Sequence, residues 1–265
     1  NVQHQAGYSY CFACETRFYD NVVKLTKEKV RSMATTGEWN EISERNISVE
    51  TAKKFNTKVK RAGNITTHHL YGYYNSNGDH IGNKIRQTKD KRMWVEGEIS
   101  DAVLFGQNIF NQKAKYITIC EGEVDAMSAY ELMGSKWPSV SIKTGAAGAL
   151  RDCKEAFDYL DGYDNIVICF DMDKQGQEAA EKVAQLFSPN KCKIMKMDHK
   201  DANEYLKMDQ RDSFTQAWWN AKSYTPAGII NLKDIGETLY EEEYCETCLY
   251  PWPKMNEKTY GMRTG

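Results

Sequence analysis

The chain has 265 residues, of which 41% are hydrophobic, which is enough for one or two ordinary cores. Its 35 Lys and Arg residues are nearly balanced by 37 Asp and Glu, which excludes the whole-surface cationic footprint of simple DNA-binding domains and leaves only local basic patches for nucleic acid. No stretch approaches the roughly 18 to 20 consecutive apolar residues of a membrane span, and no basic-then-apolar leader opens the chain, so we expect a cytoplasmic protein.

The first cysteines of the chain are Cys11 and Cys14, in a segment where aromatic and small side chains alternate. This CxxC spacing is typical of one hairpin of a zinc ribbon and supplies half of a tetrahedral zinc site, which needs four ligands. His4 is a conceivable third ligand. Cys245 and Cys248 lie in a linker far along the chain, so we do not expect them to complete the site. The other four cysteines lie inside apolar or helical patterns and argue against a disulfide framework.

Polar and charged sequence from residue 20 to residue 40 is typical of a linker. The spacing of apolar residues from 41 to about 58 then predicts a short helical start to a new domain. Alternating residues from 66 to 95, interrupted by the turn sequence Asn75 to Asp79, predict a β-hairpin. Residues 41–112 are therefore expected to form a mixed α/β subdomain.

After residue 115, apolar strands alternate regularly with helices. The pattern predicts strands at 116–120, 139–142, 165–170 and 192–197, with helices at 123–133, 147–160 and 176–187 between them. Such alternation implies right-handed crossovers and a mostly parallel sheet with helices on both faces. Because ligands of such sheets bind at the carboxyl ends of the strands, the chemistry of this α/β domain, residues 113–222, is expected there.

The last part of the chain, residues 223–265, is less regular. The sequence from Tyr224 to Gly228 is typical of a domain exit, residues 231–243 predict a short amphipathic helix, and the remainder is expected to be irregular. The chain begins at Asn1 without an initiator Met and stops at Gly265 after a glycine-spaced run, so we expect a fragment of a longer protein.

Acidic residues follow three of the predicted strands. Glu121 comes directly after the first, Asp171 and Asp173 after the third, and Asp201 shortly after the fourth. In a parallel sheet these carboxylates converge on one edge, where their oxygens suit Mg²⁺ or Mn²⁺, and two such ions can clamp the reacting oxygens of a phosphoryl transfer. Acidic residues after strands are also common helix N-caps, which is a fair alternative for each feature alone but a poor one for all three together.

The motif Glu121-Gly122-Glu123 after one strand, followed two strands later by Asp171-Met172-Asp173, resembles the Toprim signature shared by primases, type IA and type II topoisomerases and some nucleases. This match covers roughly residues 113 to 208. With Lys200-Asp201-Ala202-Asn203-Glu204 added, the chain is most similar to the bifunctional primase-helicases of short-tailed lytic phages, and the resemblance covers nearly all of it. It implies a Toprim fold in which Glu121, Asp171 and Asp173 coordinate Mg²⁺ or Mn²⁺, and Asp201 supports them.

Five cations occupy the nine positions from Lys84 to Arg92. An initiating polymerase must hold two triphosphates beside its metals, so fixed cations just before the acidic domain suit that task. The alternative is a solvated strand face. The resembling family has a Lys-x-Arg strand followed by a Lys, which implies that Lys84, Arg86 and Lys91 bind nucleotide, although one extra residue lies between Lys84 and Lys91.

The resemblance also gives functions to the two ends of the chain. The family carries a four-cysteine zinc ribbon, and Cys11 and Cys14 resemble its second pair, so residues 1–19 are expected to be the second half of a truncated ribbon that binds Zn²⁺ in the full-length protein. Tyr8 stands where the family has a template-reading His, which leaves the recognition trinucleotide open. Residues 223–265 resemble the linker helix and the start of a helicase domain, which implies a ring hexamer in the full-length form. The sequence has no phosphate-binding loop for nucleotide hydrolysis.

The expected function is synthesis of short RNA primers on a single-stranded DNA template during phage DNA replication, from ribonucleoside triphosphates, by metal-assisted nucleotidyl transfer in the host cytoplasm. The alternatives are a Toprim nuclease, which an assay for DNA cleavage with Mg²⁺ would reveal, and a non-catalytic DNA-binding Toprim module, against which the full acidic set argues. A topoisomerase needs a catalytic Tyr on a separate DNA-gate domain, for which the chain has no room. A phosphatase-like site has its paired Asp residues after the first strand of the sheet, whereas Asp171 and Asp173 follow the third predicted strand.

Overall fold

The structure is a computed structural model that describes residues 35–110, 114–225 and 247–263, together with the backbone of three short strands before residue 19. The chain divides into two compact units, Asn1–Tyr224 and Thr225–Gly265.

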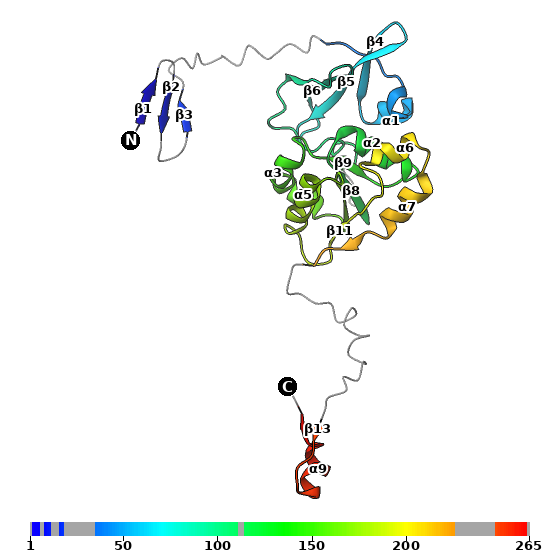
Figure 1. The fold of residues 1–265 in the computed structure, drawn as a ribbon. Coiled ribbons are helices and arrows are strands. Elements are labelled where there is room, and N and C mark those ends of the chain that lie inside the picture. The colour runs from blue at the N-terminus through cyan, green and yellow to red at the C-terminus, as the bar shows by residue number, and fades with distance from the viewer. Residues whose placement is uncertain are drawn as a thin grey trace. The chain divides into compact units, whose positions relative to one another are not determined.

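The three N-terminal strands form an antiparallel sheet in the order β1-β2-β3 (Figure 1). They are β1 (Val2–Gln5), β2 (Tyr8–Cys11) and β3 (Thr16–Phe18). Cys11 is the last residue of β2 and pairs with Val2 on one side and Thr16 on the other. Cys14 and the greater part of the predicted linker, residues 20–34, lie outside the described residues.

A four-stranded antiparallel sheet follows, in the order β4-β5-β6-β7. Its elements are η1 (Ser43–Arg45), α1 (Val49–Lys54), β4 (Thr57–Ala62), β5 (Ile65–Tyr74), β6 (His80–Gln87) and β7 (Met93–Gly97). The predicted hairpin is confirmed as β5 and β6. Its turn is held by the Asn75 side chain, which accepts hydrogen bonds from the backbone N–H groups of Asn77 (3.0 Å) and Asp79 (2.9 Å).

The helix predicted from residue 41 to about 58 is much shorter in the structure. Ile42 and Ile47 are both buried, but they pair with each other across a tight loop instead of sharing a helix face. Asn46 closes that loop in the left-handed region, with φ 58°. The helix then starts at Ser48, whose hydroxyl accepts from the N–H of Thr51 at 3.3 Å, and ends after only six residues.

The predicted, mostly parallel sheet is confirmed and has five strands in the order β12-β11-β10-β8-β9, of which the first strand alone is antiparallel. Its strands are β8 (Tyr116–Cys120), β9 (Ser139–Ser141), β10 (Asn165–Cys169), β11 (Cys192–Ile194) and β12 (Lys222–Ser223). Its helices are α2 (Glu123–Leu132), η2 (Ala146–Gly148), α3 (Ala149–Glu155), α4 (Phe157–Leu160), α5 (Lys174–Ala184), α6 (Ala202–Lys207) and α7 (Arg211–Trp219).

Helices cover both faces of this sheet, and the central strands β8 and β10 each contribute side chains to two apolar clusters. In β8, Ile117 and Ile119 pack into the cluster under α3, α4 and α5, whereas Cys120 packs into the cluster under α2, α6 and α7. Figure 1 shows the two sets of helices on opposite sides of the strands. The second cluster continues into the four-stranded sheet through Tyr71 and Tyr73, so the two sheets share a core. That continuity fixes the four-stranded sheet against the carboxyl ends of β8 and β10.

Two other predictions are corrected. The helix predicted from 147 to 160 breaks at Ala156, whose φ of −97° and ψ of 16° leave helical geometry, and the break lets the ring of Phe157 stack on Phe187 at 5.2 Å. The segment after residue 246, expected to be irregular, contains α9 (Pro253–Thr259) and the paired strands β13 (Thr247–Cys248) and β14 (Met262–Arg263).

The helix predicted at 231–243 lies outside the described residues. Within the described ranges, every helix is too short or too polar to cross a membrane.

Candidate active site

Two acidic residues lie just beyond the carboxyl ends of neighbouring strands, at the same edge of the parallel sheet. Glu121 comes directly after β8, and Asp171 follows β10 by two residues. The last residues of these strands, Cys120 and Cys169, are register partners. The two strands are separated in sequence by β9 and its flanking helices, but the sheet order makes them direct neighbours. The edge thus brings both carboxylates to one place.

Only one of the two carboxylate oxygens of Glu121 accepts a hydrogen bond from the described residues. Its Oε1 accepts a hydrogen bond from the backbone N–H of Ala146 at 3.1 Å, whereas its buried Oε2 has no hydrogen-bond partner among the described residues. Burial raises the pKa of Glu121 above its ordinary value of 4.5, and the carboxylates of Asp171 and Asp173 raise it further. A buried acceptor without a donor, beside other carboxylates, is a place where a cation would be stabilised.

Asp171 is surrounded by charges of both signs. Burial raises its pKa above the ordinary value of 3.8, and Asp201 and Asp173 raise it further, against the opposing effect of Lys200. The Lys200 ammonium lies 3.3 Å from Asp171 Oδ2, but its side chain is 57% exposed, so solvent screens it. Burial and the like charges together therefore outweigh the effect of the Lys200 ammonium on the pKa of Asp171.

Asp173 and Asp201 each cap a helix. The Asp173 side chain accepts from the N–H of Gly176 at 2.9 Å at the start of α5, and the Asp201 side chain accepts from the N–H of Glu204 at 2.9 Å at the start of α6. A side chain at Gly176 would place its Cβ 2.3 Å from the carbonyl oxygen of Asp171, so α5 begins in close contact with the acidic edge. The N-cap and metal-site explanations are compatible here, because each cap uses one carboxylate oxygen.

Asp125 is a further acidic residue at this edge, to which the sequence gave no role of its own. Burial raises its pKa well above the ordinary value, with further contributions from Asp201 and Asp171, and its Oδ1 accepts from the N–H of Asn203 at 3.3 Å. Its Oδ2 lies 2.7 Å from the position that a Cβ on Gly122 would take, so that glycine leaves room for it. The signal was present in the sequence as the last residue of Glu121-Gly122-Glu123-Val124-Asp125.

Lys84 reaches the parallel sheet from the facing four-stranded sheet. Its ammonium donates to Glu123 Oε1 at 2.7 Å and to the carbonyl oxygen of Lys143 at 3.0 Å. The hydroxyl of Tyr73 donates to the same Glu123 oxygen at 2.7 Å. The Lys84 and Glu123 side chains are only 18% and 6% exposed, so the ion pair is largely removed from water. Two of the three ammonium donors are used, which leaves one for a ligand.

Arg86 lies on the same face of β6 as Lys84, because the two residues are two positions apart in a strand. Burial and the nearby Glu123 carboxylate raise the pKa of Tyr71, and the Arg86 guanidinium beside it partly offsets that rise. Lys91, by contrast, is exposed in the turn before β7, in the left-handed region with φ 59°. The structure therefore places Lys84 and Arg86 on one face of β6 and Lys91 outside that strand.

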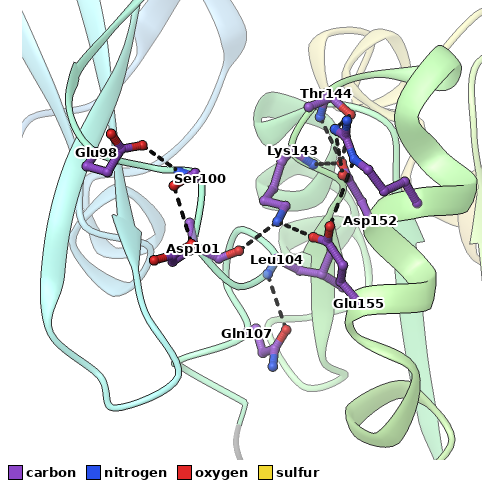
Figure 2. A network of polar contacts seen from close by, with 11 residues as sticks. Glu98, Ser100, Asp101, Leu104, Gln107, Lys143, Thr144, Asp152 and Glu155 are labelled. Atoms are coloured by element: carbon purple, nitrogen blue, oxygen red, sulfur yellow. Dashed lines mark hydrogen bonds and ion pairs between the residues drawn. The ribbon is translucent and has the colours of Figure 1, made fainter. Parts of the chain in front are cut away.

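The loop after β9 belongs to the same neighbourhood, and we did not predict its role from the sequence. Figure 2 shows Asp152 of α3 directed at the loop, where its Oδ2 accepts from the N–H groups of Lys143 (2.8 Å) and Thr144 (3.0 Å). The Lys143 ammonium extends the other way, to the Ala102 carbonyl oxygen and to Glu155. The one sequence signal was Gly145, whose φ of 70° favours glycine.

The acidic edge fits a hard divalent cation. No three His, Cys, Asp or Glu side chains within the described ranges already form a closed metal site. Mg²⁺, however, usually keeps several waters and takes one or two carboxylates plus substrate phosphates, so an open edge is what it requires. The unpartnered Oε2 of Glu121 and the raised pKa values of Glu121 and Asp171 are the observations in favour of that fit.

We expect Mg²⁺ or Mn²⁺ to stabilise the chain against heating near pH 7.5, by about 2.7 kcal/mol at a hundredfold excess over the dissociation constant. The folded-state pKa values of Glu121 and Asp171 lie above their ordinary values of 4.5 and 3.8, so the metal-free chain loses stability as the pH rises through them. Protons and metal compete for the same oxygens, and the metal-induced shift should fade on acidification. Thermal melts with and without Mg²⁺, between about pH 5 and pH 7.5, measure this metal-induced rise in the unfolding temperature. A rise of equal size at both pH values would contradict a metal site at these carboxylates.

Comparison with known sequences identifies similar proteins. A family model described as Toprim-like matches residues 118–206. A DNA helicase/primase of Enterobacteria phage T3 is 28% identical over 284 residues, which cover 100% of this chain and 50% of that protein. The chain thus spans about half the length of this curated relative.

Solved structures give a consistent result. A chain in the bacteriophage T7 complex of lagging-strand DNA polymerase with primase domains of two gp4 subunits, bound to an RNA/DNA hybrid and dTTP, is 32% identical with a TM-score of 0.64, covering 71% of this chain and 94% of that one. The primase fragment of the bacteriophage T7 primase-helicase protein is 28% identical with a TM-score of 0.65, covering 82% and 92%. A DnaG catalytic core shares the fold alone, with a TM-score of 0.53 at 15% identity, covering 69% and 72%.

Proposed function

Because this chain belongs to the family of phage primase-helicases, of which it comprises the Toprim-containing primase part, we propose that it synthesises short RNA primers on a single-stranded DNA template from ribonucleoside triphosphates. The observation that carries the proposal is the meeting of Glu121 and Asp171 at one sheet edge, next to Lys84 from the facing sheet. Carboxylates and cations side by side are what transfer of a nucleotidyl group requires, since the metal needs oxygens and the triphosphate needs positive charge.

In the proposed mechanism, Glu121, Asp171 and Asp173 hold Mg²⁺ or Mn²⁺, and Asp201 supports them from the start of α6. The bound metal would supply Lewis-acid stabilisation of the phosphoryl oxygens. The remaining N–H of the Lys84 ammonium and the Arg86 guanidinium bind the triphosphate and orient it. We also assign Lys91 to triphosphate binding; its exposed turn leaves the side chain accessible to a ligand.

The N-terminal cysteines and the attachment to a helicase domain complete the proposed function. We propose that Cys11 and Cys14 are two of the four ligands of a zinc ribbon that reads the template, of which β1 to β3 form part. We further propose that the chain works attached to a helicase domain, in a ring hexamer, within the cytoplasm of the infected host. The primase domains of the T7 complex are bound to an RNA/DNA hybrid and dTTP, which supports DNA template and nucleotides as ligands here.

The direct test is a primer-synthesis assay with labelled ribonucleotides, short single-stranded DNA templates and Mg²⁺. Metal-dependent RNA products of a few nucleotides, from the chain but not from its Glu121→Gln variant, are the expected result. If Mg²⁺ instead produced cleavage of the DNA and no RNA, the site would be a nuclease.

Replacing Arg86 with Ala should raise the Michaelis constant for ribonucleotides. The loss of one charged hydrogen bond to phosphate is worth about 1.5 to 3 kcal/mol, or roughly a 10- to 150-fold change. Steady-state kinetics over a range of nucleotide concentrations measures it. Arg92→Ala is the matched control, because the Arg92 side chain is 77% exposed and pairs with the adjacent Asp90. If Arg86→Ala weakened only the binding of template DNA, we would conclude that β6 binds the DNA template and not the nucleotide.

A further inference from the structure

We propose that Asp152, a buried residue of α3, is a positioning residue for this site: it fixes the loop from Lys143 to Ala146, and through that loop it sets the places of Glu121 and Lys84. The inference rests on the proposed function, since it takes Glu121 as a metal ligand. Asp152 has no place in the signature of acidic residues at strand ends, and its side chain bonds to the loop after β9.

The Asp152 carboxylate is fully buried and almost wholly occupied by the loop. Its side chain is 0% exposed, and its Oδ2 accepts from the Lys143 N–H at 2.8 Å, the Thr144 N–H at 3.0 Å and the Thr144 hydroxyl at 2.9 Å. Its Oδ1 accepts from Arg151 at 3.2 Å. Hydrogen bonds to an ionised acceptor are about twice as strong as neutral ones, so three of them on adjacent groups leave the loop little freedom.

The other side of this loop touches both halves of the active site. The Ala146 N–H donates to Glu121 Oε1 at 3.1 Å, and a Cβ on Gly145 would lie 3.7 Å from the same oxygen. The carbonyl oxygen of Lys143 accepts from the Lys84 ammonium at 3.0 Å. One short segment of four residues therefore carries contacts to the metal-binding edge and to the nucleotide-binding strand.

A second anchor holds the loop from the opposite direction. The Lys143 ammonium, in a side chain only 8% exposed, donates to the Ala102 carbonyl oxygen at 2.8 Å and to Glu155 Oε2 at 2.7 Å (Figure 2). This anchor fixes the side chain of Lys143 but leaves its N–H and the N–H of Thr144 without acceptors if Asp152 is removed. The Lys143 N–H is buried, and a buried donor without an acceptor favours a shift of the backbone, which here moves the Ala146 N–H away from Glu121.

The test measures metal binding directly. Binding of Mn²⁺ to the chain, followed by electron paramagnetic resonance, should weaken by about 10- to 100-fold in Asp152→Ala, the range typical when a group that orients a metal ligand is lost. The Michaelis constant for ribonucleotides should rise in the same variant, because Lys84 loses its fixed partner on the loop. Asp152→Asn should recover most of the binding, since its amide oxygen can still accept from both loop N–H groups.

The control is Cys153→Ala, the next residue of α3, which is also 0% exposed but packs into the apolar cluster and takes no part in the hydrogen bonds described for the loop. Cys153→Ala should lose stability without losing Mn²⁺ affinity. If Asp152→Ala does not fold, Thr144→Val removes one of the three bonds and should weaken Mn²⁺ binding by a smaller factor. If the folded Asp152→Ala variant binds Mn²⁺ as tightly as the parent chain, the inference about Asp152 is wrong, but the proposed metal site still stands. The same holds for Thr144→Val when that is the variant tested. Binding that is equal in the parent chain and in Glu121→Gln would overturn the proposed metal site, and this inference with it.

Discussion

Glu121→Gln and Asp171→Asn should each reduce primer synthesis by about 1,000-fold or more, equivalent to roughly 4 kcal/mol of transition-state stabilisation, while the fold stays intact. Each change keeps the volume of the side chain and removes the negative charge that the metal needs. The pKa values of both carboxyls are raised in the fold, so their ionised forms cost stability at neutral pH. The neutral variants should therefore unfold at the same temperature as the metal-free parent or slightly above it.

The measurement combines a synthesis assay at saturating Mg²⁺ with a thermal melt. Asp164→Asn is a suitable control, since Asp164 is exposed just before β10, at the end of the strand opposite to Asp171. Near-normal synthesis by either site variant would refute the assignment of Glu121 and Asp171. A large fall in unfolding temperature would instead mean that the carboxylates serve the fold.

Lys84→Met should destabilise the chain by about 3 kcal/mol, in addition to any loss of nucleotide binding. Met keeps most of the aliphatic volume of Lys, but Glu123 is then left as a buried carboxylate with only the Tyr73 hydroxyl as donor on that oxygen. Urea unfolding followed by tryptophan fluorescence gives the free energy. Lys60→Met is the matched control, because Lys60 is an exposed lysine on the same sheet, where surface changes are worth within about 0.5 kcal/mol.

The double variant Lys84→Met with Glu123→Gln isolates the pair. Removing both charges should recover about 1 kcal/mol or more relative to the sum of the single changes, since residues in contact are not additive. Strict additivity would mean that the 2.7 Å contact between Lys84 and Glu123 contributes no coupling energy.

The sequence was informative about the acidic edge because the signal there is local and repeated. Ile117 and Ile119 in β8, and Ile166 and Ile168 in β10, predict buried strands, and an acidic residue follows each strand within two positions. The parallel arrangement then places the carboxyl ends on one edge whatever the strand order. Helix lengths were less predictable, since the apolar pattern that includes the isoleucines at 42 and 47 predicts a helix, whereas both residues are buried in a loop.

Contacts between distant residues had no such signal. Lys84 is 39 residues from Glu123 and 59 from Lys143, so neither partner can be read from the spacing of charges in one segment. Asp152 looks like an ordinary helix residue in the sequence, and its burial against a loop appears only in three dimensions. For Asp173 the sequence suggested both a helix cap and a place among the acidic residues, and only the structure shows that it caps α5 through the Gly176 N–H while lying near Glu121 and Asp171.

The two glycines at the acidic edge limit how sequences of this kind can diverge. A Cβ at Gly122 would meet the Asp125 carboxylate at 2.7 Å, and one at Gly176 would meet the Asp171 carbonyl oxygen at 2.3 Å. The second contact is with backbone, which no rotamer change can relieve. Any residue larger than glycine at position 176 therefore requires a shift of α5, and such a shift would also disturb Asp173, which caps that helix. Related sequences with the same acidic edge are expected to keep glycine at positions 122 and 176 and to differ at the surrounding positions.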